Sequence, residues 1–523
     1  MLERERGQDC QLLCVTNLII GLWTKWFLHL NNLPNLWHSW VMSTQNALTQ
    51  LKEFRQQVYT LFPERADALM DLLDALSGNT RARSVIALSL NSPFRRGYSS
   101  VPDSIDNFFR ATDLEQASVE RRVQDKALLR LIARQLTPPV QRKFWLFGLD
   151  TTPQPRPFAD TLGDRTYVYQ PNGVIKGNKP VTIGHEYSVL VNFPEKAQAA
   201  PLWVVPLWIR RVASTENKLA VGAEQIQALL TDTTLPFHLK LCVEVEDSAY
   251  SVAPFLGRVA HHANLVTVTR LRGNRKLYRQ AAGPVADAQG HPVWYGEPFA
   301  LKDPTTWGKP EVTAQTTYTG QRGRTFTVQL EGWYNLLMCG AKDLPMHPHP
   351  FTVIRVRVLD EQGQLISPRP MWLIVFGARR HELSLLEAWQ AYSQRYDIEH
   401  FFRFGKQRLL MTAFQTPVAE HEENWWQIGQ LAYVQLWLGR SSSSALPRPW
   451  ERYLPSTPEV DATPSAVQRD WERVTRQIGT PAAAPKPRGK SAGRAKGARP
   501  PRRQRCPVIK KSAQKRPKTP ART

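Results

Sequence analysis

The chain of 523 residues contains few cysteines, and their placement excludes several kinds of site. Its five cysteines are scattered, none forms a CxxC pair, and no His/Cys cluster has the spacing of a zinc site. An odd number of scattered thiols fits a reducing cytosol better than a disulfide framework. The sequence also has no run of 18 or more apolar residues, no P-loop and no internal repeats. We therefore expect neither a membrane span nor an NTPase of the P-loop class.

Acidic residues are missing from the end of the sequence. The chain carries 68 Lys and Arg against 45 Asp and Glu, and residues 481–523 supply 15 of these bases and no acid. The net charge of +23 predicts a polyanionic partner, most commonly nucleic acid, although a membrane surface or a ribosome would also fit. Because large apolar residues are scarce there, we expect residues 481–523 to be a disordered basic tail. Such a tail would either grip DNA non-specifically or only solubilise the chain.

The first part of the chain shows helical periodicity. Residues 1–41 lack a regular pattern, and we interpret them as a non-conforming N-terminal extension. Apolar residues then recur at helical spacing, which predicts two helices over residues 43–77 and another over residues 114–136. The last of these helices is rich in Arg. We interpret residues 42–138 as a helical N-terminal DNA-binding region, with an ordinary solvated helix surface as the alternative.

Two predicted strands end in aspartate. Lys143–Asp150 is a short apolar run typical of a buried strand, and His238–Asp247 alternates apolar residues before its last aspartate. A short helix over residues 253–262 and a strand over residues 264–270 follow, as in a βαβ-type unit. An aspartate at the end of a single strand can simply begin a turn. Two such strands make a pair of functional carboxylates the hypothesis to test.

The second of these strands carries competing carboxylates, Glu244 and Glu246. Alternation places Asp247 on the side of Val243 and Val245, and Glu246 on the opposite side. Asp247 closes the strand, where a ligand is best exposed to solvent. We therefore favour Asp247 as the functional carboxylate.

The remainder of the chain divides into a β-rich segment and a helical end. Residues 270–380 contain runs typical of strands, separated by Gly and Pro turns. Within this segment, core packing is the better expectation for Trp307 and Trp333. Trp425–Leu438 is strongly apolar and predicts a core helix. Residues 441–480 are rich in Ser and Pro, and we expect a linker that ends in a short helix.

The stretch Ser384–Leu410 has no Pro and a single Gly near its end, and it predicts one long helix. At roughly 100° per residue, five of its polar residues fall within about 80° of arc. A solvated face with i,i+4 charge pairs is one interpretation of this arrangement. The other is a phosphodiester site in which a carboxylate holds a metal and cations hold phosphates. The five residues are Tyr392, Arg395, Glu399, Arg403 and Lys406.

The spacing Tyr-x2-Arg-x3-Glu-x6-Lys resembles the signature of cut-and-paste insertion-sequence transposases, a branch of the DDE transposases. All four signature residues are present at that spacing. The resemblance implies an α/β fold: a ribonuclease H-like catalytic core with a β-rich insertion, a helical N-terminal domain and the basic tail. It divides the core into residues 139–269 and 381–440, with residues 270–380 as the insertion.

The resemblance also implies the residues of the site. Asp150, Asp247 and Glu399 would be the catalytic metal ligands, holding two Mg²⁺ ions that Mn²⁺ is able to replace. Carboxylates suit this role because hard cations prefer oxygen ligands, and two metals activate the attacking oxygen and stabilise the leaving oxygen. The residues implied to contact DNA phosphates are Tyr392, Arg395, Arg403 and Lys406.

The function implied by the resemblance is DNA transposition. The protein would cut at the terminal inverted repeats of its mobile element and join the freed end to target DNA, as a homodimer on DNA in the bacterial cytosol or nucleoid. Two alternatives stay open at this point. One is a DNA-binding derivative or regulator that has lost catalysis, and the other is a Mg²⁺-dependent nuclease of the same fold that does not transpose.

Overall fold

The structure of the chain is a computed structural model. It describes residues 33–62, 64–113, 115–170, 180–196, 200–281, 293–320, 323–445, 461–487, 493, 495–499 and 501–510. The predicted N-terminal extension lies outside these residues up to residue 32.

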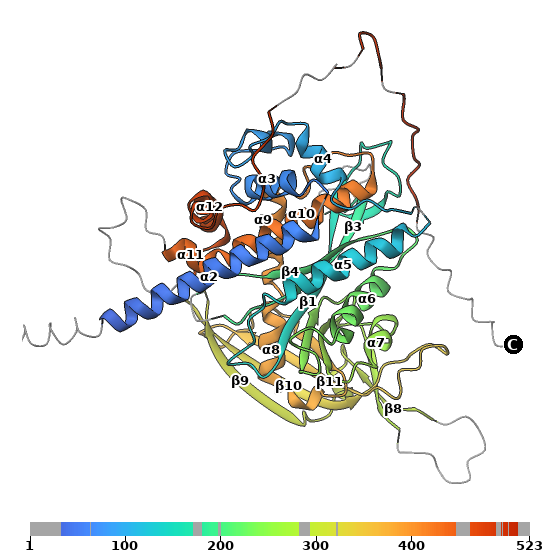
Figure 1. Cartoon of the computed structure of the whole chain (residues 1–523). Coiled ribbons are helices and arrows are strands. Elements are labelled where there is room, and N and C mark those ends of the chain that lie inside the picture. Colours follow the sequence, from blue (N-terminus) through green and yellow to red (C-terminus); the bar gives the residue numbers. More distant parts are fainter. Residues whose placement is uncertain are drawn as a thin grey trace, which may run out of the picture.

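A mixed sheet of 10 strands forms the centre of the described part of the chain (Figure 1). Its order is β2-β3-β1-β5-β6-β12-β11-β10-β9, and β4 pairs with β3 off this path. The strands are β1 (Trp145–Pro155), β2 (Thr166–Tyr169), β3 (Val181–Asn192), β4 (Val205–Val212), β5 (Cys242–Glu246), β6 (Leu265–Leu271), β9 (Val312–Thr319), β10 (Thr325–Leu336), β11 (Phe351–Leu359) and β12 (Met371–Phe376). A separate two-stranded sheet contains β7 (Lys276–Gln280) and β8 (Tyr295–Ala300).

The pairing directions place the ends of the central strands. β1 runs antiparallel to β3 and parallel to β5, and β5 runs parallel to β6. The carboxyl ends of β1 and β5 therefore lie at the same edge of the sheet. The strands β12, β11, β10 and β9 continue this sheet in antiparallel pairs beyond β6. The segment predicted as a β-rich insertion thus extends the main sheet, while the proposed division into domains stays a prediction.

Helices cover both faces of the sheet. The longer ones in the described residues are α2 (Leu33–Leu61), α3 (Ala66–Ser77), α5 (Ala117–Ala133), α6 (Lys218–Thr231), α8 (Leu385–Gln394), α9 (Asp397–Gln407), α10 (Ala419–Leu438) and α12 (Pro464–Ile478). The short helices are α4 (Ser100–Asp106), α7 (Ala253–Val259) and α11 (Arg440–Ala445). The predicted helices over residues 43–77 and 114–136 are confirmed by α2, α3 and α5.

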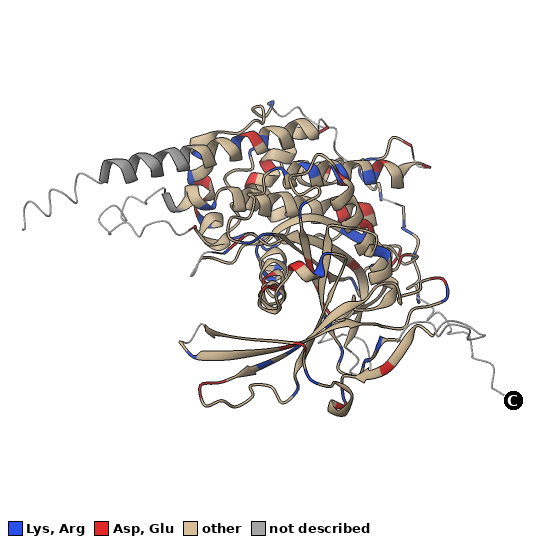
Figure 2. Ribbon diagram, turned by 90° about the horizontal axis from the view of Figure 1, so that it is seen from below, with Lys and Arg blue, Asp and Glu red and all other residues tan. Residues whose placement is uncertain are grey.

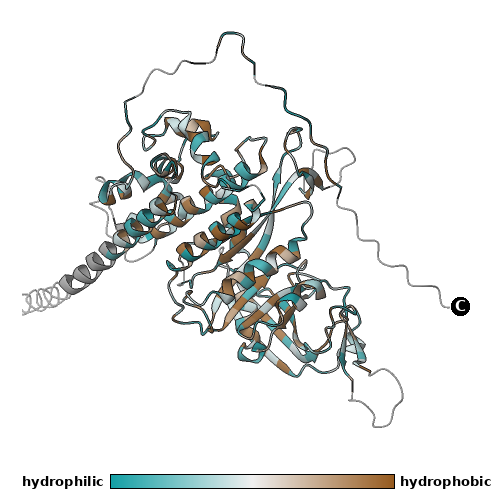
Figure 3. Ribbon diagram, turned by 45° about the vertical axis from the view of Figure 1, so that its right-hand side comes forward, coloured by the Kyte–Doolittle hydropathy of each residue, from teal (hydrophilic) through white to brown (hydrophobic). Residues whose placement is uncertain are grey.

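Neighbouring residues of β3 show which helices lie on which face. The Tyr187 ring stacks on Trp426 of α10, with 4.4 Å between ring centroids. The next residue, Ser188, donates a hydrogen bond of 2.7 Å to Gln225 of α6. Because side chains alternate along a strand, α10 and α6 cover opposite faces. Apolar residues of the strands and of the helix faces that meet them form the core, and Figure 3 shows their concentration inside the molecule.

The prediction of one long helix over Ser384–Leu410 is wrong. The stretch forms α8 and α9, and the chain turns at Arg395 and Tyr396 between them. No Gly or Pro marks this break. Tertiary contacts explain it: Gln394 donates to the Pro194 carbonyl at 3.0 Å, and the buried Asp397 carboxylate forms an ion pair with Lys196. These contacts fix the junction and override local helix propensity.

Two further expectations need correction at the end of the chain. Residues 440–445, partly assigned to a linker, form α11, whereas the predicted short helix is confirmed as α12. The predicted disorder of the basic tail does not apply to its described part near Cys506. There the Cys506 amide donates to the Asp160 carbonyl at 2.7 Å, and the Ile509 amide donates to the Arg165 carbonyl at 2.8 Å. Backbone hydrogen bonds of this kind need no large apolar side chain.

None of the helices in the described ranges is long and apolar enough to cross a membrane. Figure 2 shows bases and acids interspersed over the helical part of the molecule, while the long strands at the bottom of that view carry fewer charges.

Candidate active site

The sheet brings the two predicted strand-end aspartates together. The parallel pairing of β1 with β5 stops at Leu149 and Glu246, so the next residues, Asp150 and Asp247, lie side by side. Both aspartates are half-buried after a run of buried residues. The prediction that the first strand ends at Asp150 is wrong, because β1 continues to Pro155 and Asp150 pairs with Val189 of β3. The second strand does end beside its aspartate, at Glu246.

Asp150 lies in an environment that favours its neutral form. Its side chain is 14% exposed, and burial raises the pKa of its carboxyl to about 6. The ion pair with Arg395 opposes this rise, whereas the nearby charges of Asp247 and Glu399 add to it. Its two carboxylate oxygens accept hydrogen bonds from the Thr151 amide at 2.8 Å and from Arg395 Nη1 at 3.1 Å. Burial is therefore the main cause of the raised pKa of Asp150, and a bound cation would favour the charged carboxylate.

A turn after β5 holds Asp247. Its Oδ1 accepts a hydrogen bond of 2.7 Å from the Ala249 amide, and its carbonyl accepts one of 3.2 Å from the Tyr250 amide. The first bond leaves the other carboxylate oxygen free for a ligand. Asp247 thus both begins a turn and presents a carboxylate beside Asp150, so the two interpretations of a strand-end aspartate are compatible here.

Glu399 reaches the site from the first turn of α9. The side chain is exposed, and its backbone amide donates to the Tyr396 carbonyl at 3.2 Å where the helix begins. Its charge acts on Asp150, as described above, and on Lys406: burial lowers the pKa of the Lys406 ammonium, and Glu399 opposes this shift. The third predicted carboxylate therefore lies within electrostatic reach of the first.

The predicted cations differ in their surroundings. The Arg395 guanidinium pairs with Asp150 and also lies over the rings of Tyr396 and Tyr392, at 5.1 Å and 5.8 Å from their centroids. The half-buried Lys406 donates to the Thr152 hydroxyl at 2.6 Å, two residues beyond Asp150. These contacts bring both cations beside Asp150 and Thr152 in the middle of β1.

The other two residues predicted to contact DNA, Arg403 and Tyr392, differ in their exposure to solvent. Arg403 is exposed on α9, whereas the Tyr392 side chain is 1% exposed. The buried Tyr392 ring packs against Arg395, and its side chain is not presented to solvent. Sequence reasoning missed Thr152, whose place two residues after Asp150 on an alternating strand was the available signal.

The competing carboxylates occupy a different environment. Glu244 and Glu246 are 1% and 0% exposed in the middle and last position of β5, and their oxygens have no hydrogen-bond partner among the described residues. Burial raises the pKa of Glu244 to about 8, and burial together with Glu244 raises that of Glu246 further. Alternation turns both away from the side that Asp247 follows. Their position supports the preference for Asp247.

The carboxylates predicted as ligands are of the type that binds a divalent cation, but they do not form a cluster in the described part of the chain. Within the described ranges, no group of three or more His, Cys, Asp or Glu side chains lies close enough to hold a metal ion. Asp150 and Asp247 nevertheless supply oxygen ligands from adjacent strands, as hard cations require. The pKa of Asp150 is raised mainly by burial, and a bound cation would act in the same direction as Arg395, toward the charged carboxylate.

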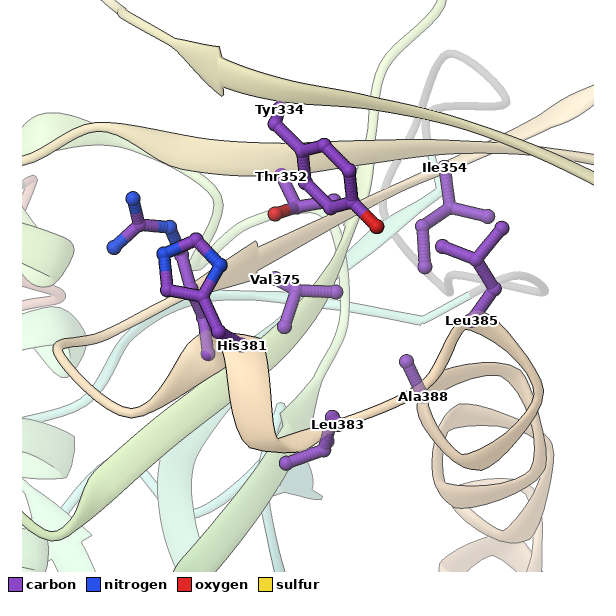
Figure 4. A pocket seen from close by; sticks show the side chains of 9 residues that line it. Tyr334, Thr352, Ile354, Val375, His381, Leu383, Leu385 and Ala388 are labelled. Atoms are coloured by element: carbon purple, nitrogen blue, oxygen red, sulfur yellow. The ribbon is translucent and has the colours of Figure 1, made fainter. Parts of the chain in front are cut away.

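A small pocket lies where α8 packs on the sheet (Figure 4). Its volume is about 50 Å³, and its polar groups come from Tyr334, Arg380 and His381. Arg380 is held by Asn335, to whose side-chain oxygen it donates at 2.9 Å. The apolar lining includes Leu385 and Ala388 of α8, which the pocket places directly over β11 and β12. This packing fixes α8, and Arg395 directly follows the last residue of this helix.

The two tryptophans of the β-rich segment are core residues, as predicted. Trp307 and Trp333 are 9% and 1% exposed and pack against Trp372 of β12, with ring centroids 5.0 Å and 5.9 Å away.

Comparison with known families agrees with the geometry of the strand ends. A family of DDE superfamily endonucleases matches residues 57–331, which is 275 of the 523 residues and includes Asp150 and Asp247. The match ends before α8 and α9, so it does not cover the Tyr-Arg-Glu-Lys spacing. No curated protein matches the chain. With more than half of its residues matched and its two aspartates side by side, the chain belongs to the DDE superfamily endonucleases.

Proposed function

We propose that this DDE endonuclease is a transposase that cuts DNA at the ends of a mobile element and joins them to target DNA. One observation carries the proposal. Asp150 and Asp247 lie side by side where the parallel pairing of β1 and β5 ends, in a chain that belongs to a family of endonucleases. The net charge of +23 supports DNA as the partner.

The catalytic core proposed here is ribonuclease H-like. The order β4-β3-β1-β5-β6, with two antiparallel pairs followed by two parallel pairs, supports this assignment. Asp150 lies within the central strand β1, and Asp247 follows its parallel neighbour β5. A ligand bound there would meet both aspartates where the pairing of the two strands ends.

Asp150, Asp247 and Glu399 are the residues proposed to hold the metal, taken to be two Mg²⁺ ions that Mn²⁺ is able to replace. When bound, the ions would activate the attacking oxygen and stabilise the leaving oxygen at phosphorus. Carboxylates must be deprotonated to ligate, and the raised pKa of Asp150 means that a cation has to displace a proton or Arg395 from it. Binding is therefore coupled to a change of partner for Asp150.

The cations of α8 and α9 are proposed to hold phosphates that flank the cut. Arg395 and Lys406 already lie beside Asp150 and Thr152 of β1, where the reacting phosphate would sit. Arg403 is exposed one turn after Glu399 and extends this surface, and Tyr392 orients Arg395. The helical region up to residue 138 and the basic tail are proposed to contact DNA further away. Because two ends must be joined, the active form would be a homodimer on DNA.

Cleavage of the cognate ends tests the proposal. The purified full chain is incubated with DNA that carries the sequences flanking its own gene, in Mg²⁺ or in EDTA. We expect metal-dependent cutting at the ends that is lost in Glu399→Gln and retained in Glu420→Gln, an exposed glutamate in the first turn of α10. Equal cutting by wild type and Glu399→Gln would refute the role of Glu399.

One observation favours a second candidate, a DNA-binding derivative without catalysis. The ligand atoms are not gathered in the described part of the chain, and Arg395 neutralises Asp150. Specific binding to the ends without cutting, unchanged in Glu399→Gln, would establish this candidate. Cutting without joining to a target would instead identify a nuclease that does not transpose.

A further inference from the structure

Tyr250 has a buried hydroxyl group without a partner beside the proposed metal site. The side chain is 1% exposed, and its hydroxyl makes no hydrogen bond among the described residues. Most buried hydroxyls in folded proteins are hydrogen-bonded, because leaving one unpaired costs about 1–3 kcal/mol. A group retained at such a cost needs an explanation.

The backbone directs the Tyr250 ring beneath the strand ends. Tyr250 closes the turn that begins at Asp247, and its amide donates to the Asp247 carbonyl at 3.2 Å. The ring packs edge-to-face on Phe255 of α7, with centroids 5.0 Å apart. It also lies against Gly222 of α6, where an added Cβ would come within 3.4 Å of the ring and collide with Leu149. The absence of a side chain at Gly222 therefore makes room for Tyr250 next to the residue that precedes Asp150.

Carboxylates surround the hydroxyl. Burial and the charges of Asp150 and Asp247, followed by Glu186 and Glu246, hold the pKa of Tyr250 well above its usual range. The hydroxyl therefore stays protonated and is available only as a neutral donor or acceptor. Asp150 is meanwhile occupied by Arg395 and the Thr151 amide, and Asp247 by the Ala249 amide. The hydrogen bonds of both aspartates in this structure thus come from groups other than the Tyr250 hydroxyl.

We propose that Tyr250 is a positioning residue of the metal site, whose hydroxyl donates a hydrogen bond to the Asp150–Asp247 carboxylate pair when a divalent cation is bound. The inference rests on the proposed metal-dependent function. A carboxylate that exchanges Arg395 for a cation loses the guanidinium that now orients it, and Tyr250 supplies an unused buried hydroxyl on a residue whose backbone is bonded to Asp247. Outer groups of this kind orient ligands, and their loss typically weakens metal binding by about 10–100-fold.

The test compares Tyr250→Phe with Tyr433→Phe. Phe keeps the ring that fills the space beside Gly222 and Phe255, so the fold is retained. Tyr433 is a matched control because it is also buried, at 2% exposure, and packs on Phe401, away from the strand ends. Thermal unfolding of the full chain is followed without metal and over a titration with Mn²⁺ alone, which yields the apparent Mn²⁺ dissociation constant of each protein.

Tyr250→Phe is expected to unfold at the wild-type temperature or above it without metal, because it removes an unpaired buried hydroxyl. Its Mn²⁺ dissociation constant should rise by about tenfold, while Tyr433→Phe keeps the wild-type constant. An unchanged constant in Tyr250→Phe would overturn the inference and leave the metal site intact. A wild type that does not respond to Mn²⁺ would overturn the metal site itself, and the inference with it.

Discussion

Strand β5 carries carboxylates in two contrasting environments. Glu244 and Glu246 are enclosed by the sheet and its covering helices, without hydrogen-bond partners in the described part of the chain. Asp150 within β1 and Asp247 just after β5 are half-buried, with backbone amides and Arg395 as partners. The two glutamates are closed off from solvent, whereas the two aspartates are partly open to it. The proposed function therefore assigns the metal to the half-buried aspartates and a structural role to the buried glutamates.

The largest effect is expected when one carboxylate of each kind is replaced by its amide and DNA cleavage is compared. Asp247→Asn should lower metal-dependent DNA cleavage by on the order of 10³-fold, because a metal ion contributes several kcal/mol to the transition state. Glu246→Gln, one residue earlier, should change cleavage by less than about threefold if its environment only buries it. Initial rates on the same end DNA measure both. A larger loss in Glu246→Gln than in Asp247→Asn would reverse the assignment.

The buried glutamates, Glu244 and Glu246, should instead affect the stability of the folded protein. The pKa of Glu244 is raised in the folded protein, to about 8, above its value in the unfolded chain. The folded state therefore binds more protons between these two values, and stability falls as pH rises from about 4.5 to 8. Glu244→Gln should stabilise the protein by on the order of 2 kcal/mol at pH 8 and have little effect at pH 4.

Denaturant unfolding at both pH values checks this prediction, with the exposed Glu420→Gln as the control. A destabilised Glu244→Gln at pH 8 would mean that the Glu244 carboxylate has a partner that stabilises its charged form.

The smallest effect is expected on DNA binding, when the cation Lys406 is replaced. Lys406→Gln should weaken binding to end DNA by about tenfold at low salt and reduce the slope of log K against log salt by about 0.9. Arg476 on α12 is exposed and pairs with Glu472, and Arg476→Gln should leave both quantities unchanged. Fluorescence anisotropy over a range of salt concentrations measures them. Equal slopes for Lys406→Gln and wild type would exclude a phosphate contact at Lys406.

The sequence was sufficient for elements whose pattern is local. The strands predicted before Asp150 and Asp247, the following helix α7 and the core helix α10 have strong apolar patterns, and all are present, although β1 continues past Asp150 to Pro155. β3 and β4 were not predicted, although they complete the sheet beside β1. The run of Gly184, His185 and Glu186 interrupts the apolar pattern of β3, and buried polar partners compensate for it: His185 Nδ1 lies 2.7 Å from Glu422.

The sequence could propose the residues of the candidate site, but it could not predict their present arrangement. Strand ends and the Tyr-Arg-Glu-Lys spacing pointed to Asp150, Asp247 and Glu399. They could not show that Arg395 pairs with Asp150, because this contact joins residues 245 positions apart. Nor could they show the break between α8 and α9, since it depends on Lys196 and Pro194. Tertiary contacts of this kind have no local signal in a single sequence.

A switch of metal preference tests the central claim most directly, namely that Asp150 and Asp247 hold the catalytic metal. Asp150→Cys replaces a hard oxygen ligand by a softer sulfur, which Mg²⁺ disfavours and Mn²⁺ tolerates better. Cleavage of the end DNA is measured for wild type and Asp150→Cys in each metal. The account predicts that the variant is inactive in Mg²⁺ and partly restored in Mn²⁺, while wild type cuts in both. Wild-type cleavage by Asp150→Cys in Mg²⁺ would contradict it.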